Sequence, residues 1–231
     1  MKNLQSLAVA VGVLGMTLPA SVRATCDQAN LHEGDFSGNS QHTSAPGVFT
    51  VGEAFTAYET LNTTQTQPWY PWNQAAYQYT LYVHGTCSSY VNIPIGGPMF
   101  LRQISFTGVT FAIYQDNTTV ANYAIPSTFT DGALILSGVI TGPGTGGGMY
   151  AEGVVDGAAP DVLGITGDAT VTGGSGIGQL LCSVLTLNDF IAWLPASSPP
   201  GYKEAYDSQW KCCLTTPVEP STWGGVKSLY R

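Results

Sequence analysis

Basic residues are scarce in this chain of 231 residues, which has seven lysines and arginines against 15 aspartates and glutamates. Charged residues as a whole make up only 10% of the composition, where about a quarter is usual. Nucleic acid and anionic lipid are poor partners for such an acidic surface. We therefore expect no nucleic-acid partner, and we expect the surface to owe its polarity to Thr, Ser, Asn, Gln and Gly, as β-rich extracellular proteins do.

The chain also lacks an apolar run long enough to cross a membrane as a helix. Its N-terminal apolar stretch, Leu7–Leu18, is shorter than the ~20 residues that a spanning helix needs. With Lys2 ahead of it and small residues near Ala24, the segment has the layout of a secretory signal peptide. We predict that residues 1–24 are removed and that the mature chain, with no transmembrane segment, is secreted, periplasmic or at the cell surface. Removal leaves five basic and 15 acidic residues, a net charge of −10.

Cysteines are few, and their number is odd. The five are Cys26, Cys87, Cys182, Cys212 and Cys213, so at most two internal disulfides form. Cysteines in an exported chain are expected to pair, but adjacent cysteines rarely bridge each other because the small ring strains the peptide between them. We predict that Cys212 and Cys213 seek separate partners, and that a bridge from this pair to Cys26 or Cys87 tethers the C-terminal extension to the rest of the chain.

No long helical stripe runs through the middle of the chain, whose periodicity is that of strands. From Tyr77 to His84 the sequence YQYTLYVH alternates between an apolar and a polar side. Apolar residues occupy even positions from Phe100 to Phe106 and odd positions after Gly108, which predicts a bulge or bend at this glycine. Short strands separated by glycine-rich turns indicate a mainly β protein, an antiparallel β-sandwich or barrel.

The ends of the mature chain look different from its middle. Residues 25–46 have little apolar content and are expected to form an irregular N-terminal arm. Residues 47–187 form the expected β domain, and residues 188–231 a C-terminal extension with short helices. One helix is expected from Asn188 to Leu194, and a second through Lys211, because Tyr202, Tyr206 and Trp210 recur at four-residue spacing. Further strands are expected at Val48–Tyr58, Ala133–Thr141, Met149–Val155, Ala169–Thr172 and Gln179–Leu187.

Established catalytic motifs are missing. The segment GGSGIG at residues 173–178 is not the nucleophile pattern G-x-S-x-G, and with three histidines in the chain His84 is the best placed for a triad. Two carboxylate pairs, Glu53 with Glu59 and Glu152 with Asp156, would each share one side of a straight strand. A glycosidase needs two carboxylates across a cleft, but unpaired carboxylates at solvated edges explain the same spacing.

Aromatic residues concentrate between Gln67 and Tyr82. Trp69, Tyr70 and Trp72 lie in a proline-containing, turn-rich segment, and Tyr82 follows on the polar side of a strand. Exposed rings of this kind can stack on sugars or anchor a protein partner. We predict an aromatic binding platform made of these four residues, with burial in the core as the alternative.

Two sets of polar residues are candidate metal ligands. His32, Asp35 and His42 lie close together near the mature N-terminus, and Asp116 and Asp131 bracket a loop. Imidazole and carboxylate groups bind divalent metals, and oxygen-rich loops bind calcium. HExxH and the EF-hand pattern are both absent, and Asx turns explain the loop residues equally well. Calcium or another divalent metal is therefore the only cofactor that the sequence suggests.

These observations favour a secreted, non-enzymatic, β-rich protein that binds an extracellular partner or assembles with copies of itself as a surface or structural subunit. A protein partner, self-association or a glycan would fit its open sheet edges and aromatic turns. A secreted hydrolase of polysaccharides, with Glu152 and Asp156 as its carboxylate pair, is one alternative. An extracytoplasmic metal-binding protein is another.

Overall fold

The structure is a computed structural model that describes residues 31–64, 67–156, 162–192 and 198–213. The expected signal segment, residues 1–24, and Cys26 lie outside the described residues. Across the described part of the chain, no helix has the length and apolar character needed to cross a membrane.

Strands and two short 3-10 turns make up the regular structure of the described residues. They are β1 (Leu31–Gln41), β2 (Ala54–Thr64), β3 (Gln78–Gly96), β4 (Met99–Asp116), η2 (Pro126–Phe129), β5 (Ala133–Thr141), β6 (Met149–Val155), β7 (Val162–Gly173), η3 (Ile177–Gln179), β8 (Val184–Ala192) and β9 (Glu204–Cys213). The expected mainly β class is therefore confirmed. Strands β5 and β6 have the predicted bounds, and the other expected strands are longer or shifted.

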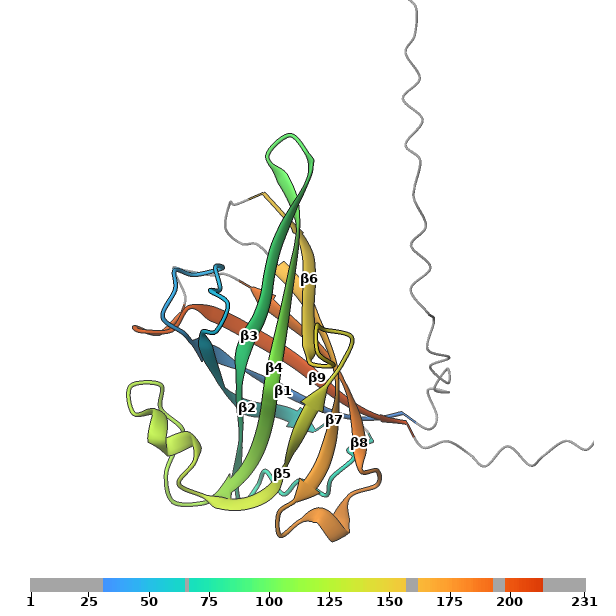
Figure 1. Ribbon diagram of the computed structural model, residues 1–231. Helices are drawn as coiled ribbons and strands as arrows, with labels where there is room; N and C mark the ends of the chain where they lie inside the picture. The colour runs from blue at the N-terminus through green and yellow to red at the C-terminus, as the bar shows by residue number, and fades with distance from the viewer. Residues whose placement is uncertain (1–30, 65–66, 157–161, 193–197, 214–231) are drawn as a thin grey trace, which may run out of the picture.

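The strands form one antiparallel sheet of nine strands whose pairings return to their starting point. Each of β1 to β4 pairs with the next strand along the chain. Strand β5 pairs with β7, β7 with β8 and β8 with β9, and β9 pairs again with β1. Strand β6 lies outside this circuit and pairs with both β4 and β7. Figure 1 shows the long strands crossing around a common centre.

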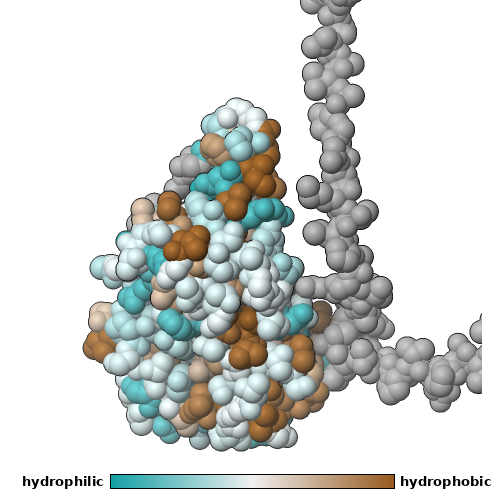
Figure 2. Space-filling view, in the orientation of Figure 1, coloured by the Kyte–Doolittle hydropathy of each residue, from teal (hydrophilic) through white to brown (hydrophobic). Residues whose placement is uncertain are grey.

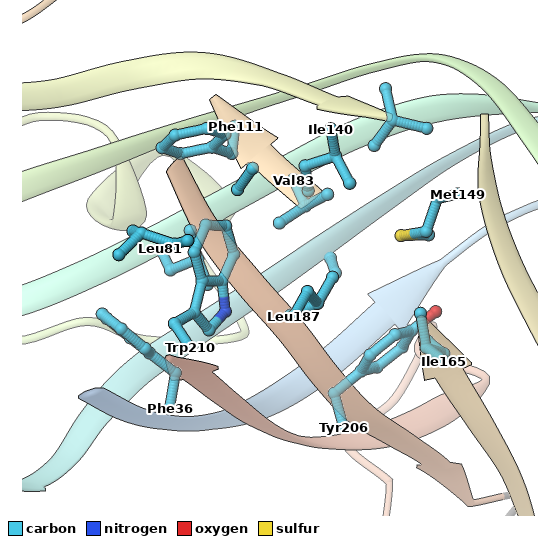
Figure 3. Packing of buried hydrophobic residues seen from close by; sticks show 14 of the residues in the cluster. Phe36, Leu81, Val83, Phe111, Ile140, Met149, Ile165, Leu187, Tyr206 and Trp210 are labelled. Carbon is cyan, nitrogen blue, oxygen red and sulfur yellow. The ribbon is translucent and has the colours of Figure 1, made fainter. Parts of the chain in front are cut away.

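The core occupies that centre, and every strand contributes to it. Alternate residues of each strand point inward, as expected for a half-buried strand, and bury one hydrophobic cluster. Its members include Phe36 of β1, Leu81 of β3, Phe111 of β4, Ile140 of β5, Met149 of β6, Ile165 of β7, Leu187 of β8 and Trp210 of β9. Figure 3 shows these side chains pointing toward one another from strands that are far apart in the sequence.

The predicted irregularity at Gly108 is confirmed. Pairing of β3 with β4 shifts between His84↔Thr110 and Thr86↔Thr107, so β4 carries one extra residue there. Gly108 adopts a positive φ of 60°, a conformation that glycine reaches without steric cost. The bulge keeps the even-numbered apolar residues before Gly108 and the odd-numbered apolar residues after it on the core side of β4.

The predicted C-terminal helices are wrong. Val184–Ala192 forms β8 and Glu204–Cys213 forms β9, while the rest of the expected first helix, residues 193 and 194, lies outside the described residues. Tyr206 and Trp210 are both buried. A four-residue spacing is a multiple of the strand period of two, so it places these two residues on one side of a strand as readily as on one side of a helix.

The N-terminal segment is also more regular than expected, because Leu31–Gln41 is strand β1, between β2 and β9. Two glycines make this position possible. A Cβ on Gly38 would lie 1.9 Å from the carbonyl oxygen of Tyr58, and one on Gly34 would lie 2.7 Å from the indole nitrogen of Trp69. Both distances are too short for a side chain, so β1 approaches its neighbours where only glycine fits.

A disulfide joins Cys182, which follows η3, to Cys212 in β9. The sequence predicted a bridge from Cys212 or Cys213 to Cys26 or Cys87. For Cys212 this prediction is wrong, because its partner is Cys182. Cys87 instead has a buried free thiol, and burial raises the pKa of this thiol. The disulfide therefore links β9 to the segment between β7 and β8.

Candidate functional site

A hairpin made of the end of β3 and the start of β4 projects from the molecule. Figure 1 shows its tip extending beyond the other described strands. We call residues 88–103 the projecting arm. Strand β3 pairs with β4 along its length but with β2 only from Thr80 to Thr86. Within the described residues, the arm's part of β3 therefore has a strand on one side and an open edge on the other.

One face of the projecting arm is apolar. Ile93 lies opposite Leu101, which in turn lies opposite Val154 of β6. Directly opposed residues of antiparallel strands share a face, so these side chains form a row across three strands. The large hydrophobic residues exposed here are Val91 (43%), Ile93 (41%), Ile95 (51%), Met99 (43%) and Val154 (50%). Figure 2 shows hydrophobic residues along one side of the projection; contiguous exposure of this kind marks an interaction site more often than scattered exposure does.

The projecting arm is also free of charge over most of its length. No Asp, Glu, Lys or Arg lies between Ser88 and Leu101, although the whole chain carries a net charge of −8. The first charged residue after this segment is Arg102, which is buried. Its charge points away from the apolar face, because successive residues of a strand face opposite sides.

The opposite face of the projecting arm is anchored to the loop between β1 and β2. Arg102 donates from Nη1 to the carbonyl oxygen of Gly47 at 2.8 Å and from Nε to Asn92 Oδ1 at 2.9 Å. The hydroxyl of Tyr90 donates to the same Gly47 oxygen at 3.3 Å, and the Arg102 guanidinium lies 5.5 Å from the centre of the Tyr90 ring. These contacts fix the position of the arm from its base.

A buried polar network continues from this loop into the sheet. The N–H of Gly47 donates to Glu204 Oε1 at 3.1 Å, and His42 Nε2 lies 2.7 Å from the same oxygen. The other ring nitrogen of His42 lies 3.3 Å from Glu53 Oε1, and Ser40 donates to Glu204 Oε2 at 2.5 Å. We call His42, Glu53 and Glu204 the buried triad. Each ring nitrogen of His42 therefore lies against a carboxylate oxygen.

Glu53 is the most heavily hydrogen-bonded carboxylate of the buried triad. It accepts hydrogen bonds from the backbone and hydroxyl groups of Thr43 and Ser44 and from the N–H of Thr50. Burial alone raises the pKa of this carboxyl, but these hydrogen bonds outweigh it and hold the pKa well below its usual range. The side chains of His42 and Glu204 are 0% exposed, so the triad supports the loop and has no access to a substrate.

A second buried carboxyl, Glu59, points into the core. Ser208 donates to Glu59 Oε2 at 2.5 Å, and burial, with Asp207 and Asp35 adding to it, raises the pKa of Glu59 to about 7. Trp210 lines the same internal cavity, which leaves only about 10 Å³ for the centre of a water molecule. This is room for about one water. The indole nitrogen of Trp210 points into the cluster in Figure 3 and has no hydrogen-bond partner among the described residues.

The outer face of the sheet carries a groove floored by tyrosines. Its volume is about 400 Å³. It is lined by Tyr58, Tyr82, Tyr114, Pro126, Ser127 and Thr130. Tyr82 lies 6.4 Å from the ring of His84, nearly parallel to it, and His84 Nδ1 lies 3.2 Å from the hydroxyl of Thr56. The sequence placed His84 best for a catalytic triad. In the structure it contacts a tyrosine and a threonine.

The predicted aromatic platform is wrong in three of its four members. Trp69, Tyr70 and Trp72 are buried in the core, and Trp69 donates from its indole nitrogen to the carbonyl oxygen of Trp210 at 2.9 Å. Large aromatic rings stabilise the fold more when they are buried than when they are exposed. Burial in the core is the alternative that the sequence left open. Tyr82 is half-buried and faces the tyrosine groove.

The carboxylate pairs do not form a described cleft. Glu152 is exposed and accepts hydrogen bonds from Tyr150 at 2.5 Å and Gln103 at 2.6 Å, which places it at the rim of the apolar face. Asp156 is exposed after the end of β6. Glu53 and Glu59, expected at solvated edges, are instead buried in separate environments. None of these observations favours a glycosidase.

The candidate metal ligands do not converge in the described residues, which contain no group of three His, Cys, Asp or Glu side chains that could hold a metal ion. His32 lies 3.3 Å from the carbonyl oxygen of Pro68, and His42 belongs to the buried triad. Asp35 is only partly buried, and Asp131 is exposed. Asp116 accepts hydrogen bonds from the backbone and hydroxyl of Thr118, and the backbone bond is the main cause of the lowered pKa of Asp116.

Comparison with known proteins gives no relative: no family model, no curated protein and no solved structure matches this chain.

Proposed function

We propose that this protein is a secreted, non-enzymatic assembly subunit, and that two copies join through the apolar face of the projecting arm. The observation that carries the proposal is the uncharged row of Ile93, Leu101 and Val154 on a projecting hairpin. An apolar face of this kind gains free energy when it leaves water, at roughly 25 cal/mol per Å².

Charge supports a second copy as the occupant. Two chains with a net charge of −8 each repel one another over most of their surfaces. The segment between Ser88 and Leu101 carries no charge, so copies approach there at the least electrostatic cost. A two-fold axis through the apolar face would bring each row against its own counterpart, the isologous contact that most dimers use.

Rigidity supports the same assignment. Arg102 and Tyr90 fix the arm against the carbonyl of Gly47, so little conformational entropy is lost when a partner binds. We also infer that the strand circuit is a barrel and not a sandwich, since the eight strands other than β6 form a closed circuit of pairings. A barrel holds its strands in fixed positions and would give the arm a rigid base.

The proposal predicts that the mature protein is a dimer and that Ile93→Lys makes it monomeric. Ile93 is 41% exposed, so lysine is tolerated in the monomer, but a charge at the centre of an apolar interface remains unpaired and desolvated. Sedimentation velocity over a range of protein concentrations measures the change.

The matched control is Val120→Lys, because Val120 is 78% exposed and lies in another loop. We expect this variant to dimerise as the parent chain does. A parent chain that remains monomeric at its highest attainable concentration, or an Ile93→Lys variant that still dimerises, would contradict the proposal.

A further inference from the structure

We infer that the tyrosine groove between the sheet and η2 is a binding site for a neutral saccharide. The groove lies at the opposite end of β3 and β4 from the tip of the projecting arm, as Figure 1 shows by the position of η2. It is independent of the assembly proposed above.

The floor of the groove is a fixed aromatic surface. Tyr58 of β2 lies directly opposite Tyr82 of β3, and Tyr114 of β4 lies two residue pairs further along, opposite Thr80. The Tyr58 ring is packed edge-on by Tyr82 at 5.6 Å and Phe129 at 5.3 Å, so its orientation is set before any ligand arrives. Flat rings held in this way match the apolar faces of pyranose rings.

The wall of the groove is equally well fixed. The hydroxyl of Thr80 donates to the carbonyl oxygen of Phe129 at 2.7 Å, which attaches η2 to β3. Tyr123 donates to the carbonyl oxygen of Tyr58 at 3.2 Å, and Tyr202 donates to that of Tyr123 at 3.1 Å. The loop that forms the wall is therefore tied to three separate parts of the chain.

The lining selects for a neutral, hydroxyl-rich ligand. It offers three phenol and two aliphatic hydroxyls, from Tyr58, Tyr82, Tyr114, Ser127 and Thr130, and no charged side chain. Burial, followed by the proximity of Tyr82, raises the pKa of both Tyr58 and Tyr114, so these phenols stay protonated and can donate. The volume of about 400 Å³ lies within the range of small-molecule sites.

Two other ligand classes fit less well. An acidic glycan would meet no cation in the lining and would approach a chain with a net charge of −8. A proline-rich peptide also docks on aromatic grooves, but it has few hydrogen-bonding groups that could pair with the five hydroxyls of this lining.

The test is calorimetric titration of the mature protein with neutral hexasaccharides of β-1,4-linked glucose, β-1,3-linked glucose and β-1,4-linked mannose. We expect at least one of them to bind, and Tyr82→Ala to weaken that binding by about tenfold or more, the equivalent of about 1.4 kcal/mol. Ser127→Trp fills the groove from an exposed position and should abolish binding without disturbing the core. Tyr150→Ala, a half-buried tyrosine of β6 outside the groove, should bind as the parent chain does.

Three results would overturn the inference. One is the failure of every neutral hexasaccharide to bind the parent chain. Another is binding that survives both Tyr82→Ala and Ser127→Trp. The third is tighter binding of an oligogalacturonate or a proline-rich decapeptide than of any neutral hexasaccharide.

Discussion

Replacing His42 by alanine is expected to lower the free energy of unfolding by about 3 to 5 kcal/mol. The imidazole lies between Glu53 and Glu204 with its side chain 0% exposed. Its removal leaves two carboxylates facing each other across a space that water does not reach, which is the arrangement that makes breaking a buried ion pair so costly. Urea unfolding followed by tryptophan fluorescence measures the change as a lower midpoint.

A matched control compares the stability lost in His42→Ala with the stability lost when a histidine outside the buried triad is removed. His84→Ala removes a half-buried imidazole that contacts Thr56 and the ring of Tyr82, and we expect a change of less than about 1 kcal/mol. Similar unfolding midpoints for the two variants would show that the buried triad contributes no more to the free energy of unfolding than a surface contact does. His42→Ala should also loosen the loop between β1 and β2 at Gly47, which anchors the projecting arm. Amide hydrogen exchange in the arm should therefore increase.

Glu59→Gln is expected to change how stability depends on pH. The pKa of Glu59 is about 7 in the folded protein, mainly because of burial, against 4.5 as its ordinary value. Between these two values the folded state binds more protons than the unfolded state, so the free energy of unfolding falls as pH rises through this window. The fall amounts to about 3 kcal/mol and is complete above pH ~7, since one pKa unit corresponds to ~1.36 kcal/mol.

The glutamine variant keeps a neutral group beside Ser208 and has no proton to lose. Its stability should match that of the parent chain near pH 4 and exceed it by about 3 kcal/mol at pH 8. Thermal unfolding at half-unit pH steps compares the two chains. A Glu59→Gln profile parallel to that of the parent would contradict the expected pKa.

The strands that alternate strongly could be predicted from the sequence. YQYTLYVH gave the buried side of β3, and the change from even to odd apolar positions located the bulge at Gly108. Strand β1 was missed because its inward positions include Gly34, Gly38 and Ser40, which carry no apolar signal. Gly34 and Gly38 are small because Trp69 and the backbone of β2 approach so closely there.

The buried triad could not have been predicted, since Glu204 lies far along the chain from His42 and Glu53. His42 and Glu204 are 162 residues apart, and only the pairing of β1 with β9 brings their strands together. The sequence indicates His42 as a candidate metal ligand and Glu53 as the partner of Glu59, and it draws no attention to Glu204. The sequence does not predict that residues 88–103 project from the molecule, because their exposure depends on where the pairing of β2 with β3 ends.

The anchoring of the arm has a mechanical consequence. In the proposed dimer, tension applied to the joined arms would pass through Arg102 to the backbone of Gly47 and from there to Glu204 in β9. Strand β9 is bonded along its length to β1 on one side and β8 on the other. A pull on the assembly would therefore load many backbone hydrogen bonds at once, and the subunits should separate at their contact before either one unravels.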